Sequence, residues 1–156
     1  MQGQLRRKGE SFLILIERIL GTIILATGSI YDVKRKSIPK IYAWIAIGIS
    51  FIFVIFIRRT HVVECMAGLA EGAVAVILAR LCGVFGEGDG MVLGSIGLLV
   101  GAFSGLVVLF WSVLFAAVFA MIILVSRKGK GKSTIPFLPF MMAGFFTYEV
   151  MGGGVW

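Results

Sequence analysis

The chain has 156 residues, of which 59% are hydrophobic and 15% are charged, and its net charge is +7 at neutral pH. A soluble domain of this size has too little polar surface to cover so much apolar material, so the composition excludes a soluble globular protein. Basic loops beside a bilayer explain the positive charge through contact with anionic membrane lipid, and we expect no nucleic-acid binding. The composition therefore predicts an integral membrane protein.

The apolar stretches predict six helical segments, at about 20 residues for each membrane crossing. In chain order they cover residues 12–31, 41–57, 62–82, 91–102, 104–125 and 135–150. The fourth is too short to cross alone, so residues 91–125 form either a half-helix followed by a full helix or two tilted helices joined near Gly101. We expect an all-α, polytopic membrane protein with about six transmembrane helices, five being the alternative, and a single domain over residues 1–156.

The third segment carries a stripe of small residues interrupted by two carboxylates. At helical spacing, one face holds Glu64, Ala67, Gly68, Glu71, Gly72 and Ala75. Such a stripe is expected to face other helices rather than lipid. We expect Glu71 to pair with a basic neighbour such as Arg80 or Arg18; the alternative is that it forms a polar wall near a functional site.

Basic residues divide unequally between the two ends of the predicted segments. One side holds Arg6, Arg7, Lys8, Arg58 and Arg59, and the other holds Lys34, Arg35, Lys36, Lys40, Arg127, Lys128, Lys130 and Lys132. By the positive-inside rule, the second group is cytoplasmic. That side also carries Asp32 and Asp89, so we expect a multi-pass plasma-membrane protein with both aspartates at the cytoplasmic face.

Asp32 and Asp89 are the candidate catalytic residues, because a carboxylate is costly beside apolar segments and is functional by default there. Aspartyl proteolysis needs one ionised carboxylate to activate water and one protonated carboxyl to act as general acid. The glycines of residues 86–89 would allow a substrate backbone to approach closely. Taken singly, each aspartate also fits an ordinary turn or helix N-cap.

Three motifs in chain order make the combination more specific. Asp32, Arg35, Ile38 and Pro39 form the first, residues 86–89 form a Gly-x-Gly-Asp run, and residues 135–140 form an Ile-Pro-Phe-Leu-Pro-Phe run. Together they resemble the type IV prepilin peptidases, membrane aspartyl proteases of the GxGD class. The resemblance covers essentially the whole chain.

The resemblance implies removal of the short basic leader from type IV prepilins or pseudopilins, after a glycine, at the cytoplasmic membrane face. Asp32 and Asp89 would be the catalytic pair, with water as the only co-reactant and with no metal or cofactor. We assign substrate binding to Gly86, Glu87, Gly88, Pro136 and Pro139. Among these, Glu87 would attract a basic leader by its charge.

The chain departs from the family pattern at two positions near the motifs: Met91 stands where a lysine is usual, and Lys40 stands where an asparagine is usual. The larger members also have an N-terminal region with paired cysteine motifs that is associated with methylation, and we expect this chain not to methylate. Archaeal preflagellin peptidases share the same motifs. The competing functions are a small proton-coupled transporter, in which Asp32, Glu71 and Asp89 form a relay, and a noncatalytic assembly factor.

Overall fold

The computed structural model describes residues 2–35, 38–57, 62–82, 86–125 and 136–152. Within these ranges the chain is entirely helical, which confirms the predicted all-α class. The six helices are α1 (Gln2–Arg35), α2 (Lys40–Phe56), α3 (Val62–Cys82), α4 (Glu87–Val100), α5 (Ala102–Val125) and α6 (Leu138–Val150). The basic residues counted at positions 36, 58, 59, 127, 128, 130 and 132 lie outside the described ranges.

The helices differ in their capacity to cross a membrane. Among the described residues, three apolar stretches are long enough to do so, namely Phe12–Arg35 within α1, Val62–Leu81 within α3, and the whole of α5. The shorter helices α2, α4 and α6 have 17, 14 and 13 residues. The fold is thus that of a polytopic membrane protein in which long and short helices are packed together.

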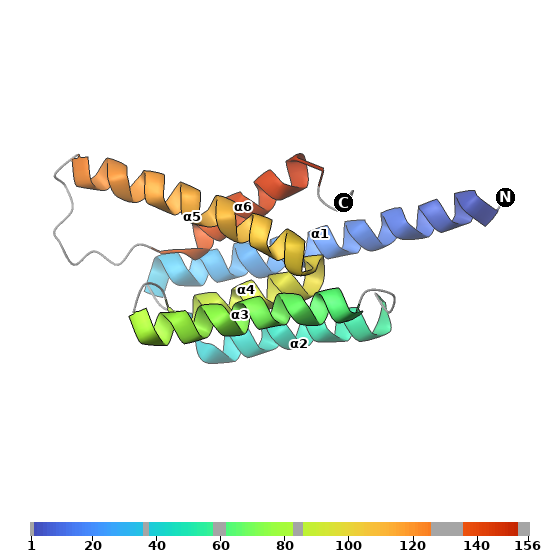
Figure 1. Cartoon of the computed structure of the whole chain (residues 1–156), viewed down its shortest axis with the longest axis horizontal. Helices are drawn as coiled ribbons and strands as arrows, with labels where there is room; N and C mark the ends of the chain where they lie inside the picture. Colours follow the sequence, from blue (N-terminus) through green and yellow to red (C-terminus); the bar gives the residue numbers. More distant parts are fainter. Residues whose placement is uncertain (1, 36–37, 58–61, 83–85, 126–135, 153–156) are drawn as a thin grey trace.

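Helix α1 is longer than the predicted segment 12–31 at both ends. Its first turns are rich in arginine, glutamine and lysine, which are good helix formers but carry no apolar signal. Figure 1 shows this N-terminal half projecting beyond the other helices, while the second half lies among them. Hydropathy therefore located the membrane-embedded part of α1 and not its full length.

Helix α4 is the centre of the fold and packs against α1, α2, α3 and α5. All residues from Val92 to Val100 are buried. The helix ends at Gly101, whose φ of +91° lies in a region that favours glycine, and α5 begins at the next residue. Of the two arrangements predicted for residues 91–125, the structure therefore has the short helix followed by the full-length one.

Gly68 and Gly72 of the small-residue stripe on α3 face α4, as predicted for helix packing, whereas Ala67 of the stripe is exposed. A Cβ atom added to Gly68 would lie 2.1 Å from the carbonyl oxygen of Gly97, and one added to Gly72 would lie 2.3 Å from the Cα of Gly94. The two backbones approach this closely because neither helix has a side chain at these positions. This contact fixes α4, and with it the position of the Gly-x-Gly-Asp motif.

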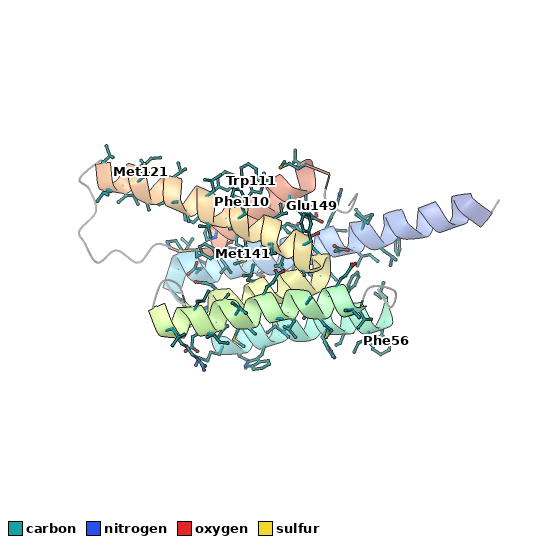
Figure 2. The ribbon with its side chains drawn as sticks, viewed as in Figure 1. Phe56, Phe110, Trp111, Met121, Met141 and Glu149 are labelled. Atoms are coloured by element: carbon teal, nitrogen blue, oxygen red, sulfur yellow. The ribbon has the colours of Figure 1, made fainter. Side chains whose placement is uncertain are left out.

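The apolar residues divide between the helix interfaces and an outer surface. Figure 2 labels one example of each: Met141 of α6 is fully buried, whereas Met121 of α5 lies on the outer side and is 66% exposed. The outer surface also includes Trp44, Phe103 and Phe110. In a bilayer such side chains contact lipid, which accounts for the apolar excess that the composition showed.

Candidate active site

Asp32 lies in the last turn of α1 and is 5% exposed. Its Oδ2 accepts a hydrogen bond of 3.0 Å from the backbone N–H of Leu138, the first residue of α6. The first N–H groups of a helix have no acceptor within that helix, so a carboxylate from another element is a suitable partner. The contact joins two segments that are 106 residues apart in the sequence.

Asp89 lies in the first turn of α4, which begins after the N-cap residue Gly86. Asp89 is therefore not the N-cap that its sequence context allowed: it is the third residue of the helix, and its Oδ2 accepts a hydrogen bond of 3.1 Å from the N–H of the N-cap residue Gly86. Burial, and next the negative charge of Asp32, raise the pKa of Asp89 to about 6, while the Gly86 N–H opposes the shift. The influence of Asp32 on the pKa of Asp89 shows that the two carboxyl groups are close enough to interact.

The first two motifs are in direct contact through Gly88. A Cβ atom at this position would lie 2.8 Å from the Cβ of Ile38, which belongs to the connection between α1 and α2. A glycine at position 88 therefore allows this connection to rest on the first turn of α4. Gly86, by contrast, is exposed at the entrance to that turn.

The third motif lies beside Asp32. Pro136 and Pro139 are half-buried, Pro139 being the second residue of α6. Between them, Leu138 is fully buried against α1: a Cβ at Gly28 would lie 2.3 Å from its Cδ2. A proline fits the first turn of a helix because the N–H that it lacks would have no acceptor there. Ile135, the first residue of the motif, lies outside the described residues.

Glu87 differs from the other candidates because it already has cationic partners. Its carboxylate lies 3.0 Å from Nε of Arg80 on α3 and 3.3 Å from Nζ of Lys40 on α2. These contacts, with Arg80 first, hold the pKa of Glu87 below its usual range. Lys40 occupies the position where the family usually has asparagine, so this departure supplies one of the partners of Glu87. Met91, the other departure, packs against the apolar core.

The prediction that Glu71 pairs with Arg80 or Arg18 is wrong. Arg80 lies near the end of α3 beside Glu87, and Arg18 pairs with Glu149 of α6. Both carboxylate oxygens of Glu71 are buried without a hydrogen-bond partner in the part of the chain that the structure describes. They lie against α5, where a Cβ at Gly105 would be 2.6 Å from Oε2. Glu71 and Arg80 are nine positions apart in the sequence, which places the two side chains at different levels of α3.

Sequence reasoning missed a hydroxyl contact near Asp32. The Tyr42 hydroxyl of α2 donates to the Ile24 carbonyl of α1 and lies 2.7 Å from the Thr27 hydroxyl oxygen. The Tyr42 ring also packs on Tyr31, with the two ring centroids 5.8 Å apart. These contacts fix the last turns of α1, which carry Asp32, against α2. The sequence of one helix does not indicate which residues of another helix will contact it. The available signal was Thr27, a hydroxyl residue that precedes Asp32 by little more than one helical turn.

Two buried carboxyl groups on different helices, one with a raised pKa, define this region as a carboxyl pair suited to acid–base chemistry in a helical membrane protein. The described residues include no group of three metal-ligating side chains.

The sequence model of the type IV leader peptidase family matches residues 19–121, more than half of the chain, and the protein belongs to this family. The matched region includes Asp32 and residues 86–89, and it ends before the third motif.

The family match confirms the family resemblance that the motifs indicated. It shows that this membrane protein belongs to a family of peptidases. Comparison with curated proteins and comparison with solved structures both gave no match. The family assignment therefore rests on the family model.

Proposed function

We propose that this protein is an aspartic endopeptidase that removes the basic leader peptide from type IV prepilins or pseudopilins. Cleavage follows a glycine and takes place at the cytoplasmic face of the plasma membrane. The observation that carries the proposal is the electrostatic interaction between the buried carboxyl groups of Asp32 and Asp89. Membership of the leader peptidase family supports the substrate class.

In this reaction one aspartate is ionised and the other holds a proton. The ionised carboxylate removes a proton from water as the water oxygen bonds to the scissile carbonyl carbon, and the protonated carboxyl donates its proton to the carbonyl oxygen. Collapse of the tetrahedral intermediate breaks the C–N bond: the carboxyl group that took the water proton gives it to the leaving amine, and the other carboxylate takes a hydroxyl proton of the intermediate, which restores the starting states. Burial keeps the two pKa values apart, because both groups cannot easily be ionised in so little water.

The starts of α4 and α6 form the proposed groove for the substrate backbone. Gly86 is exposed there and has no side chain to obstruct the substrate, and Gly88 carries the contact with Ile38 beside it. Pro136 and Pro139 flank Leu138, whose N–H meets Asp32. The basic leader would lie toward Glu87, in competition with the two cations already bound there. The apolar outer surface of the helices keeps this groove at the membrane, in contact with lipid.

The test is cleavage of a co-expressed prepilin that has a basic leader and a glycine before the cut. Asp32→Asn and Asp89→Asn are each compared with the wild type, and Glu71→Gln serves as the matched carboxyl-to-amide control. We expect each aspartate variant to lose about a thousandfold in rate and Glu71→Gln to retain full activity. Equal cleavage by all four proteins would overturn the proposal.

The same set of variants separates the two alternatives. A proton-coupled transporter would lose proton flux in Glu71→Gln, whereas a noncatalytic assembly factor would support pilus assembly with either aspartate replaced. Pilus assembly and proton flux are therefore measured beside cleavage. If the protein is a peptidase, pilus assembly should be lost in Asp32→Asn. It should be restored when pilin that already lacks the leader is supplied.

A further inference from the structure

Gly28 of α1 lies about one helical turn before Asp32 and on the same face, because residues four positions apart share a face of an α-helix. Gly28 is buried, and side chains from two other helices occupy the space beside it. A Cβ atom at this position would lie 2.3 Å from Cδ2 of Leu138 on α6 and 3.2 Å from Cε1 of Tyr42 on α2. Three helices therefore meet at Gly28, one turn from the candidate catalytic residue.

The contact between Gly28 and Leu138 determines where Asp32 finds its hydrogen-bond donor. The Leu138 side chain is fully buried against Gly28, and its backbone N–H is bonded to Oδ2 of Asp32. Side chain and N–H belong to one residue, so a displacement of the side chain at Gly28 moves the donor as well. The residues that follow offer no equivalent donor, because Pro139 has no N–H and the N–H of Phe140 bonds within its own turn.

The contact between Gly28 and Tyr42 joins α2 to the same part of α1. The Tyr42 hydroxyl donates to the Ile24 carbonyl and lies 2.7 Å from the Thr27 hydroxyl oxygen, and its ring lies against Gly28. The ring also packs on Tyr31, which immediately precedes Asp32 in the sequence. The backbone that carries Asp32 is thus held by α2, while the carboxyl group of Asp32 is held by α6.

A second buried glycine on the same face of α1, Gly21, provides a comparison within one helix. It lies seven positions before Gly28, which is about 10 Å along the helix axis. A Cβ atom at Gly21 would lie 2.6 Å from Cζ of Phe145, a fully buried residue seven positions after Leu138. Helices α1 and α6 therefore pack antiparallel, with a large α6 side chain opposite each glycine. Gly21 contributes to this packing at a distance of about 16 Å from Asp32 along α1.

We infer that Gly28 is a positioning residue for Asp32: it accommodates Leu138 so that the Leu138 N–H holds the Asp32 carboxyl group in the geometry that the reaction needs. The catalytic consequence rests on the proposed function, whereas the effect of Gly28 on the hydrogen bond is a property of the protein alone. A side chain at position 28 would push the start of α6 away from α1. A displacement of about 1 Å in a catalytic group is enough to lower the rate strongly.

The hydrogen bond can be measured without substrate, through exchange of the Leu138 amide proton. The sequence has two Phe-Leu steps, at residues 12–13 and 137–138. Protein with 13C at the phenylalanine carbonyl carbon and 15N in leucine, held in lipid nanodiscs, therefore gives two signals in an NMR experiment that selects this pair. The substitution Leu13→Ile removes one signal and assigns both.

We expect Gly28→Ala to accelerate exchange at Leu138 about tenfold or more, because the N–H loses its acceptor. Exchange at Leu13, in the first half of α1, should stay unchanged and shows that the protein as a whole has not unfolded. Gly21→Ala should accelerate exchange at Leu138 much less. Unchanged exchange at Leu138 in Gly28→Ala, or equal acceleration by the two alanine substitutions, would overturn the inference.

Cleavage assays connect this contact to catalysis through a compensating pair of substitutions. Leu138→Ala removes Cδ2 and leaves the space beside Gly28 unfilled, so kcat should fall about tenfold with little change in KM. Adding Gly28→Ala to this variant places a methyl group close to the former position of Cδ2, and kcat should rise again. The double variant contains no overlap with Cδ2, so it remains a test even if Gly28→Ala alone does not fold. A double variant with no higher kcat than Leu138→Ala would overturn the inference.

Comparison with Gly21→Ala separates positioning from stability. Both glycine substitutions bring a Cβ atom into overlap with a buried α6 side chain, and both should lower the thermal unfolding temperature. We expect Gly28→Ala to lower kcat about tenfold or more and Gly21→Ala to keep kcat within about twofold of the wild type. An equal fall of kcat in both variants would make Gly28 a packing residue and overturn the inference. A wild type that does not cleave prepilin would contradict the proposed function, and the exchange measurement would then decide the effect of Gly28 by itself.

Discussion

Among the described residues, two regions that bury carboxyl oxygens differ in how these oxygens are held. Asp32 and Asp89 each accept a backbone N–H at the start of a helix, and each interacts with a second carboxyl group. Glu71 lies between α3 and α5, with neither oxygen hydrogen-bonded among the described residues. A buried carboxyl group is therefore an insufficient sign of chemistry. What distinguishes the candidate site from the position of Glu71 is that each aspartate accepts a backbone hydrogen bond and lies near a second carboxyl group.

The largest effect should come from the α3–α4 contact next to Glu71, because it sets the position of Asp89. In Gly72→Ala the new Cβ would lie 2.3 Å from the Cα of Gly94, so the two backbones must separate. We expect a loss of about 3 kcal/mol in the free energy of unfolding, together with most of the cleavage activity. Thermal unfolding in detergent and the prepilin assay measure the two effects.

The matched control for this substitution is Gly48→Ala on α2, where nothing lies within 4 Å of the added Cβ. Alanine is a better helix former than glycine, so this variant should be as stable as the wild type or slightly more stable. Equal loss of stability in both variants would mean that the close contact between α3 and α4 does not determine the effect.

The pH dependence of stability should report the ionisation of Asp89. The pKa of Asp89 is raised from 3.8 to about 6 in the folded protein, so folding favours its protonated form. The resulting stabilisation is fully present below pH 3.8 and is lost as the pH rises through about 6. It amounts to about 3 kcal/mol at most. Unfolding by denaturant at a series of pH values should show a smaller loss in Asp89→Asn than in the wild type.

Cleavage should follow the same group if Asp89 is the general acid. Above about pH 6 the rate should fall about tenfold for each pH unit, because the protonated fraction of Asp89 falls by that factor. Glu71→Gln should have the same profile as the wild type. A profile that stays flat to pH 8 would show that the ionisation of Asp89 does not limit the reaction.

Removal of the Glu71 carboxyl group should increase stability. Glu71→Leu replaces a buried polar group that has no hydrogen-bond partner by an apolar one of similar size, and we expect a gain of about 1–3 kcal/mol. Glu149→Leu is the matched comparison and should be destabilised, since it removes the ion pair with Arg18 of α1. A loss of stability in Glu71→Leu would show that this carboxyl group has a role that the packing does not explain.

The sequence predicted those features that depend on one segment at a time. Asp32, Asp89 and the glycines around it were found from local motifs, and the break at Gly101 was found from the length of the apolar run. The pairing of Arg80 with Glu87, and the burial of Glu71 without a partner among the described residues, were not found, because ion pairs between helices depend on how the helices are rotated and how far each is displaced along its axis. The hydrogen bond from Leu138 to Asp32 was missed for the same reason, since a backbone donor has no residue type that would identify it.

The smallest effect is expected at Glu87, whose charge is balanced by Arg80 and Lys40. If Glu87 helps to bind a basic leader, Glu87→Gln should raise KM a few-fold at low salt and have no effect at high salt, where surface charges are screened. Arg80→Gln should have the opposite effect and lower KM, because it releases the Glu87 carboxylate from the closer of its two partners. These opposite changes distinguish leader binding from a structural role, in which both substitutions would weaken the contact between α3 and α4 and impair cleavage alike. Unchanged KM at low salt in Glu87→Gln would remove Glu87 from the proposed substrate groove and leave its glycine and proline borders beside the aspartates.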